Sequence, residues 1–417
     1  MAKNKEIGNV PNLRFKGFEG EWEERTLEEL STKIGDGLHG TPVYAEGTGY
    51  YFINGNNLTD GTVRIITNTK EVSQKDWLRN DKKSNLNTLF LSINGTIGNV
   101  ARYNGENLML GKSVAYINFK QNSEYYFHVL SSQKIQNYFI GELTGSTIKN
   151  LSLKTIRESV INVPSFEEQS KISNLLSLID NRIQTQSKII EQFKSLISKL
   201  TDEFFSDQTE LGSFGNSWIT YSVSEILEFF PTNSVSWENL DYEHGELFNL
   251  HYGMIHKNQT KLMDVSRKQL PYIKKDVLLK KPVLCRSGDV VFADASEDLN
   301  DVGKVVEFMN CADHKIASGL HTIHARDKMN LTIDGFKAFA FSSKYFKNQI
   351  KRLAHGTKVY SISVKKLQEC TIRIPSKEVQ LKIVGVLNGL EAKIDIESNI
   401  LHQLKQQKDY LLKNLFI

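Results

Sequence analysis

Residues 145–169 read GSTIKNLSLKTIRESVINVPSFEEQ, and residues 356–380 repeat the pattern 211 positions later as GTKVYSISVKKLQECTIRIPSKEVQ. The alignment continues without a gap to Phe205 and Phe416, and 19 of its 61 positions are identical. Two copies of one unit in a single chain predict a pseudo-two-fold molecule. Such molecules commonly recognise a target that also comes in two halves.

Each copy ends in a long stretch with the pattern of a coiled-coil helix. Pro164 and Pro375 stand before a serine N-cap, and acidic residues follow in the first turn. Ser165 and Glu168 have the spacing of a capping box, whereas the second copy has Val379 there. Apolar residues then recur three or four positions apart, which indicates a coiled-coil seam. The predicted seam consists of Ile172, Leu176, Ile179, Ile183, Ile190, Phe193, Ile197, Leu200, Ile383, Leu387, Leu390, Ile394, Leu401, Leu404 and Leu411.

Both stretches are interrupted at the same heptad position, by Gln186 and by Glu397. A polar residue within a seam fixes the register at some cost in stability. A helix of about 40 residues is roughly 60 Å long. With a two-fold axis perpendicular to them, the two helices are expected to pair antiparallel and to hold the preceding bodies apart. A helical hairpin used for homodimerisation is the alternative.

The body before each helix varies more than the helix does. Residues 13–22 resemble residues 211–218, in which Phe18 and Trp22 recur as Phe214 and Trp218 at an offset of 196, and residues 98–103 resemble 303–308 at an offset of 205. Short β-branched and aromatic runs between Gly, Asn and Asp predict strands and turns, and helical stretches are expected near 125–140 and 336–353. The fold class is therefore α+β, with two tandem pseudo-symmetric bodies separated by two long antiparallel coiled-coil helices.

Composition sets few limits on function. The 52 basic and 48 acidic residues give a net charge of +4, which permits an anionic partner without requiring one. No apolar run approaches the roughly 20 residues that span a bilayer, and the N-terminus lacks a signal-peptide pattern. A cytoplasmic protein is expected. The three cysteines form no CxxC motif, and they are expected to be buried free thiols.

No catalytic or metal-binding motif emerges. Residues 35–40 fit G-x-G-x-x-G, but a dinucleotide site needs a strand before this motif and a helix after it, whereas residues 27–34 have a helical pattern. Residues 105–113 imitate a P-loop with five residues between the glycines, where four are needed. The histidine pairs lack further ligands at a known spacing. We therefore expect neither catalysis nor a bound metal.

Loops in both bodies interleave basic, amide, imidazole and aromatic residues. Each loop alone could be structural, but two bodies with diverged middles are hard to reconcile with one small-molecule site. Amide and basic side chains read base edges, and hydroxyl and lysine side chains bind phosphates. The predicted DNA contacts are Asn54, Asn56, Asn57, Lys112 and Lys149 in the first body and Arg286, His321 and Lys358 in the second.

The motif order resembles the specificity subunits of type I restriction–modification systems. It comprises L-R-F-x-x-F-x-x-x-W at 13–22, G-S-T-x-K-N-L at 145–151 and I-x-V-P-x-x-x-E-Q at 161–169, followed by a second copy. The resemblance implies two target recognition domains, each reading one half of a bipartite double-stranded DNA site. The implied division is an N-terminal segment 1–20, recognition domains 21–164 and 207–375, and spacer helices 165–206 and 376–417.

The same resemblance implies the partners. Two copies of a modification methyltransferase subunit would dock on the helices and methylate adenine with S-adenosylmethionine. Restriction motor–nuclease subunits would bring ATP and Mg²⁺, so no cofactor and no membrane are expected for this chain itself. A stand-alone DNA-binding protein or a coiled-coil scaffold is the alternative.

Overall fold

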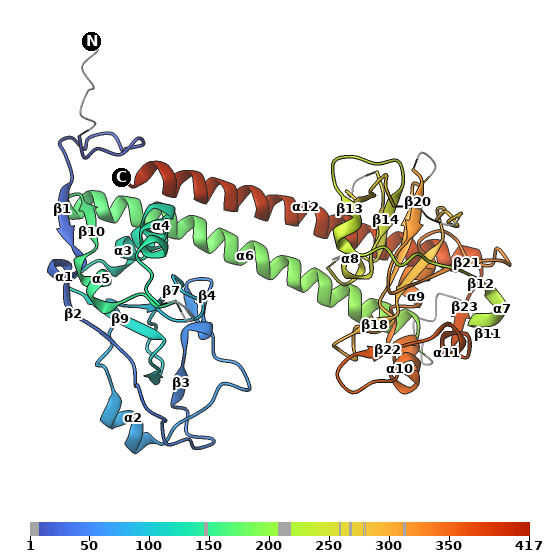
Figure 1. The fold of residues 1–417 in the computed structure, drawn as a ribbon, viewed down its shortest axis with the longest axis horizontal. Helices are drawn as coiled ribbons and strands as arrows, with labels where there is room; N and C mark the ends of the chain where they lie inside the picture. The colour runs from blue at the N-terminus through green and yellow to red at the C-terminus, as the bar shows by residue number, and fades with distance from the viewer. Residues whose placement is uncertain are drawn as a thin grey trace, which may run out of the picture. The chain divides into compact units, whose positions relative to one another are not determined.

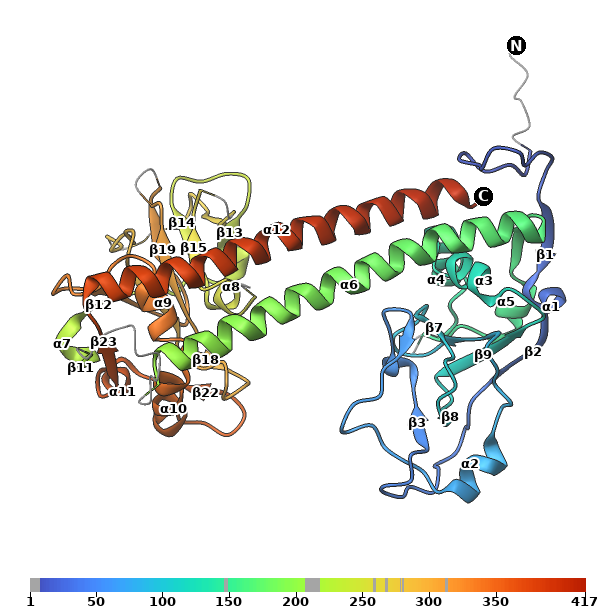
Figure 2. The ribbon, with the colours of Figure 1, turned by 180° about the vertical axis from the view of Figure 1, so that it is seen from behind.

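The computed structural model describes residues 8–145, 149–206, 218–257, 260–266, 269–277, 279, 281–311 and 314–417. The chain forms two compact units (Figures 1 and 2). Unit 1 comprises the chain up to Gln186 together with Ile400–Ile417, and unit 2 comprises Ser187–Asn399. These boundaries fall inside the long helices, so each unit contains one body and a part of each helix. None of the described helices is long and apolar enough to cross a membrane.

The two long helices are α6 (Phe166–Phe204) and α12 (Lys377–Leu415). Each has 39 residues, and their ends differ by the 211 positions of the sequence repeat, which confirms the predicted helices. In unit 1, Leu411 and Leu415 from the end of α12 share a core with Ile172 and Leu176 from the start of α6. The helices are therefore antiparallel, as predicted.

The predicted seam faces the interior along both helices. Nine of its residues are buried, namely Ile172, Leu176, Ile179, Ile190, Ile197, Ile383, Leu387, Ile394 and Leu411. The other six, Ile183, Phe193, Leu200, Leu390, Leu401 and Leu404, are half-buried. Gln186 and Glu397 are buried as well, so the matched polar positions belong to the packed face of each helix.

The start of α6 corrects one expectation. The Ser165 hydroxyl accepts a hydrogen bond from the Glu168 amide, as an N-cap should. The Glu168 carboxylate, however, accepts from both Nε and Nη2 of Arg14, each at 2.8 Å, so it binds the N-terminal segment instead of completing a capping box. The glutamine after it is used alike in both copies: Gln169 Nε2 donates to Pro164 O and Gln380 Nε2 to Pro375 O.

The body of unit 1 contains a four-stranded antiparallel sheet in the order β2-β9-β6-β7. Its strands are β2 (Ser31–Asp36), β6 (Thr88–Ser92), β7 (Val100–Arg102) and β9 (Val114–Phe119). Smaller pairs are β1 (Glu23–Thr26) with β10 (Val160–Val163), β3 (Tyr51–Ile53) with β8 (Leu108–Leu110), and β4 (Leu58–Thr59) with β5 (Thr62–Val63). The short helices are α1 (Leu27–Leu30), η1 (Gly55–Asn57), α2 (Gln74–Asn80), α3 (Ser123–Leu130), α4 (Gln133–Gly141) and α5 (Leu153–Glu158).

The body of unit 2 repeats this order as β12-β21-β17-β19 and adds β15 at the edge. These strands are β12 (Leu227–Phe230), β15 (Leu262–Asp264), β17 (Val290–Ala293), β19 (Val305–Met309) and β21 (Thr322–Asp327). Further strands are β11 (Ile219–Ser222), β13 (Leu240–Asp241), β14 (Phe248–Leu250), β16 (Tyr272–Ile273), β18 (Ala295–Ser296), β20 (Ile316–Ser318), β22 (Tyr360–Ser361) and β23 (Thr371–Ile374). The short helices are α7 (Val223–Ile226), η2 (Trp237–Asn239), α8 (Tyr252–Lys257), α9 (Phe336–Ala340), α10 (Lys344–Leu353) and α11 (Val364–Gln368).

The helical stretches expected near 125–140 and 336–353 are confirmed, and one local prediction was wrong. Each stretch is divided into two helices, α3 and α4 in the first body and α9 and α10 in the second, because serines interrupt the backbone ladder. Ser343 caps α10 by accepting from the Phe346 amide. Residues 27–34 contain only the short helix α1 and then enter β2, so the helix expected there is limited to one turn and Gly35 lies within a strand. Residues 37–50 form no helix, so the nucleotide-binding geometry is still missing. All three cysteines are buried free thiols, as expected.

Candidate DNA-recognition surface

Loops from five parts of the first body meet at one end of its sheet. Because β9 is antiparallel to β2 and β6, the loops that follow those two strands lie beside the start of β9. Backbone hydrogen bonds join them: Gly37 N donates to Val114 O, and Ile93 N donates to Ser113 O. Asn94 also bridges to Asn150. We call this surface the first reading edge; it comprises residues 37–40, 54–57, 93–98, 111–113 and 149–150.

The five residues predicted for the first body all lie on this edge. Asn56, Lys112 and Lys149 are exposed. Asn54 and Asn57 are half-buried and hold the loop, since Asn54 N donates to Asn57 Oδ1 at 3.0 Å and Asn57 Nδ2 donates to Arg64 O. Residues 146–148 of the G-S-T-x-K-N-L motif lie outside the described residues. Contact of these five side chains with DNA remains a prediction.

The second body has an equivalent surface. Gly319 N donates to Leu250 O, Asp294 N to His321 O and Ile362 N to Asp294 O. We call it the second reading edge; it comprises residues 250–256, 294–296, 319–321 and 355–361. His321 and Lys358 lie on it, and both are exposed.

The structure does not bring Arg286 to that edge. Arg286 precedes the first residue of β17, whereas the second reading edge follows the end of this strand. It lines a groove of about 550 Å³ together with His314, Lys315 and Arg326. Of the three residues predicted for the second body, His321 and Lys358 lie on the second reading edge and Arg286 lies apart from it.

The second reading edge also carries rings that were not among the predicted contacts. His251 lies 4.4 Å from the Trp237 ring and 4.6 Å from the Tyr252 ring, and Tyr252 lies 5.3 Å from His321. Burial, and to a smaller extent the nearby His321, lowers the pKa of His251. The sequence signal for these rings is the run His251-Tyr252-Gly253, which follows a short apolar strand. Such amphipathic rings combine a flat apolar face with a polar edge.

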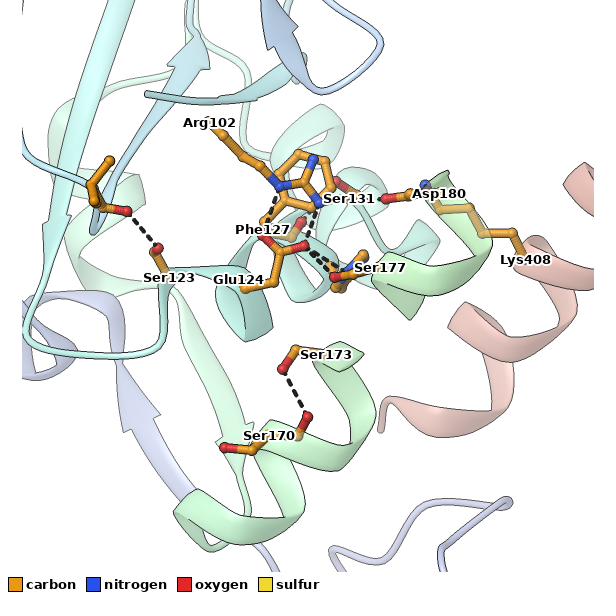
Figure 3. A network of polar contacts seen from close by, with 12 residues as sticks. Arg102, Ser123, Glu124, Phe127, Ser131, Ser170, Ser173, Ser177, Asp180 and Lys408 are labelled. Atoms are coloured by element: carbon orange, nitrogen blue, oxygen red, sulfur yellow. Dashed lines mark hydrogen bonds and ion pairs between the residues drawn. The ribbon is translucent and has the colours of Figure 1, made fainter. Parts of the chain in front are cut away.

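A polar network attaches the first body to both long helices (Figure 3). Arg102 at the end of β7 donates from Nε and Nη2 to Glu124 on α3, at 2.7 and 2.5 Å. Asp180 on α6 lies 3.4 Å from Arg102 and 2.6 Å from Lys408 Nζ on α12. Burial alone would raise the pKa of Glu124, but hydrogen bonds from Arg102, His128 and Ser177 hold it well below its ordinary value. This network positions the sheet, and with it the first reading edge, on the helices.

The second body uses other residues at the same places. Glu307 on β19 lies opposite Val290 on β17, and Arg102 on β7 lies opposite Leu89 on β6. Because Val290 and Leu89 are equivalent residues of the two sheets, Glu307 is the counterpart of Arg102. Glu307 binds Lys337 Nζ at 2.9 Å and accepts from the amides of Gly335 and Ala338. The amide of Lys261 donates to Glu391 on α12, which stands 211 positions after Asp180.

Solved structures share this architecture. The crystal structure of a type I restriction–modification system S subunit from Mycoplasma genitalium superposes with a TM-score of 0.57 over 98% of this chain and 99% of that chain, at 19% identity. A second structure, from a study of complex assembly and conformational transition in the type I system, gives a TM-score of 0.52 over 94% of this chain and 96% of that one, at 14% identity. At these identities the likeness concerns the fold.

Sequence relatives match nearly the whole length of this chain. A putative type I restriction enzyme MjaX specificity subunit from Methanocaldococcus jannaschii is 26% identical over 99% of this chain and 95% of its own. A putative type I specificity subunit, S.MgeORF438P, from Mycoplasma genitalium is 25% identical over 95% of this chain and 94% of its own. The model of the type I restriction modification DNA specificity domain matches residues 19–195 and again residues 218–406. The chain therefore belongs to the family of type I restriction modification DNA specificity proteins and carries two copies of their specificity domain.

Proposed function

We propose that this chain selects the DNA target of a type I restriction–modification complex, with each recognition domain reading one half of a bipartite site through its reading edge. The observation that carries the proposal is the repeated sheet order, β2-β9-β6-β7 and β12-β21-β17-β19, with different polar side chains at the equivalent end. A common scaffold with different side chains suits two different base sequences, because base edges are read by side chains.

The helices α6 and α12 are proposed to set the distance between the two half-sites. Each is roughly 60 Å long at 1.5 Å per residue. Buried polar residues at Gln186 and Glu397 support one fixed register, which a spacer requires. Removing one heptad from each helix should change the spacing that the complex tolerates between half-sites. An unchanged spacing would place the determinant elsewhere in the complex.

The partners proposed here are those that membership of the family implies, and the two-fold repeat suits two copies of one subunit. Two copies of a modification methyltransferase subunit, which use S-adenosylmethionine to methylate adenine, would dock on the two similar halves. Motor–nuclease subunits with ATP and Mg²⁺ would complete the restriction complex in the cytoplasm. The chain itself supplies recognition and assembly without catalysis. The predicted contacts Asn54, Asn56, Asn57, Lys112, Lys149, His321 and Lys358 remain proposals for the reading edges, whereas Arg286 would contact DNA only from outside its edge.

Mapping of methylated adenines tests this function. A host would express the methyltransferase with this chain, with this chain lacking residues 219–374, which keeps α12 and with it the core of unit 1, or alone. We expect a motif of two short sequences separated by a fixed spacer, only with the intact chain. A motif that forms without this chain, or retention of both half-sites after the deletion, would contradict the proposal. Binding of DNA by the chain without methylation would favour a stand-alone DNA-binding protein, and binding of neither DNA nor methyltransferase a coiled-coil scaffold.

A further inference from the structure

We propose that Asp294 and His321 together determine the base preferred at one position of the half-site that the second recognition domain reads. The inference rests on the proposed function and adds a residue-level determinant to it. His321 would contact the base edge, and Asp294 would act as a positioning residue for its ring.

Backbone hydrogen bonds place this pair at a position that both domains share. Asp294 N donates to His321 O at 3.1 Å, and in the first domain Ile93 N donates to Ser113 O at 2.9 Å. The carbonyl groups of Asp294 and Ile93 accept from Ile362 and Leu151, which are themselves 211 positions apart. Asp294 is thus the counterpart of Ile93, and His321 is the counterpart of Ser113.

The side chains at these positions differ in kind. In the first domain Ile93 is buried in the hydrophobic core. The Ser113 hydroxyl accepts from Gly55 N and donates to Asn54 Oδ1, so it holds its own loop. In the second domain the Asp294 carboxylate is 29% exposed and the His321 ring is 51% exposed. The backbone arrangement therefore does not require an Asp–His pair, because the first domain builds it with isoleucine and serine.

The geometry leaves one ring nitrogen of His321 for a ligand. Nδ1 lies 3.2 Å from Asp294 Oδ1, so Nε2 is the nitrogen that a base edge would meet. A hydrogen bond at one imidazole nitrogen fixes the ring orientation and the role of the other. The Tyr252 ring stands at 80° to the His321 ring, with 5.3 Å between centroids, and supports it from the side.

Two features indicate that this arrangement costs stability in the free protein. His321 has a backbone φ of +54°, a left-handed conformation that residues other than glycine use rarely. The Asp294 carboxylate is partly buried, and that burial raises its pKa although His321 opposes the shift. Backbone strain and desolvated carboxylates cluster at functional sites. Together with the half-exposed ring of His321, they point to a binding role at this place on the edge.

The test is methylation of a plasmid library with randomised half-sites by the full complex. It compares the wild-type chain with Asp294→Ala, His321→Ala and the double variant Asp294→Ile/His321→Ser, which installs the pair of the first domain. We expect about a tenfold loss of base discrimination at a single position of the second half-site. The first half-site and the spacing should be unchanged.

His321→Asn controls for misfolding, because asparagine tolerates a positive φ. This variant should assemble normally and still change the base preferred at that one position. A matched control is His39→Ala, which removes another exposed His–Asp pair, at the first reading edge, and should leave the second half-site as it is. An unchanged second half-site, or an equal loss at all positions, would overturn the inference. Neither result would affect the proposed function, which is tested separately by whether the wild-type complex methylates a bipartite motif.

Discussion

In the first recognition domain, the residue where β7 ends is Arg102, and it binds Glu124 of α3 and Asp180 of α6. In the second domain the equivalent residue of β19 is Glu307, and it binds Lys337 of α9. The charge on the strand is thus reversed, and the opposite charge on the neighbouring short helix is reversed with it. Duplication preserved the place of this contact and left its chemistry free to change.

On the long helices, unlike on the strands, the charge at the equivalent positions is the same in both halves. Asp180 on α6 and Glu391 on α12 are equivalent, and both have kept a carboxylate. The cations that approach them come from different elements: Arg102 and Lys408 approach Asp180, whereas Lys261, just before the added strand β15, approaches Glu391. The acidic position is thus the same on both long helices, while its partners in the two bodies differ. This fits a protein whose helices have the same role in both halves and whose bodies have diverged.

The largest effect is expected from breaking the pair in the second domain. Glu307 is fully buried and Lys337 is 2% exposed, so Lys337→Met leaves an uncompensated buried charge. We expect a loss of about 3 to 5 kcal/mol in the free energy of unfolding of this domain, measured by native-state hydrogen exchange. The double variant Glu307→Gln/Lys337→Met should recover most of the loss. A loss below about 1 kcal/mol for the single variant would mean that the pair contributes little.

A smaller effect is expected from the counterpart in the first domain. Arg102 is 25% exposed and Glu124 34% exposed, so solvent screens the pair and hydrates the partner that remains. Arg102→Ala should therefore cost about 1 to 2 kcal/mol in the same measurement. Arg102→Lys serves as the control, because it keeps the charge but not the two parallel hydrogen bonds. A cost equal to that of Lys337→Met would remove the contrast between the domains.

The pH dependence of the first domain provides a third comparison. Hydrogen bonds from Arg102 and its neighbours lower the pKa of Glu124 in the folded state, so its contribution to stability is complete above its ordinary pKa of 4.5. That contribution is lost as the pH falls below 4.5, because the unfolded chain then takes up a proton before the folded domain does. The stability difference between wild type and Glu124→Gln should therefore shrink as the solution is acidified. A difference that grows toward low pH would contradict the assigned direction.

The smallest effect concerns the contact between the two long helices. Lys408 stands at the position equivalent to Ile197, and it lies 2.6 Å from Asp180. Both side chains are partly exposed, so Lys408→Ala should cost only about 0.5 kcal/mol, less at high salt. The matched variant Ile197→Ala removes a buried side chain and should cost about 2 to 5 kcal/mol. Similar costs for the two variants would show that the salt bridge is not the weaker contact.

The helices could be predicted to within two residues because their signals are local. The N-cap serines, the spacing of apolar residues and the gap-free repeat all reside in contiguous sequence. Gln169 and Gln380 were visible as identities in the repeat, but their hydrogen bonds to the prolines before the helix are seen only in the structure. The same holds for the ion pair of Arg14 with Glu168, because its partners are 154 positions apart.

The reading edges were harder to predict because they depend on pairing between distant strands. The register of β17 with β21 brings Asp294 to His321 and leaves Arg286 at the far end of the strand. A loop residue with a suitable side chain is therefore not enough to predict a contact. Asn54 and Asn57 illustrate the point, since their side-chain oxygens accept hydrogen bonds from Ser113 Oγ and from Asn54 N and so hold the loop around η1.

Unit 1 draws its last core residues from the end of the chain: Leu411, Leu412 and Leu415 complete its hydrophobic core, and Leu13 N donates to Asn414 O. The ribosome makes these residues only after it has made the whole second body. The recognition domain that is made first must consequently wait for the synthesis of the second before its core can close. A message truncated within the second body would yield a first domain with an open apolar face, which is the surface that chaperones and proteases bind.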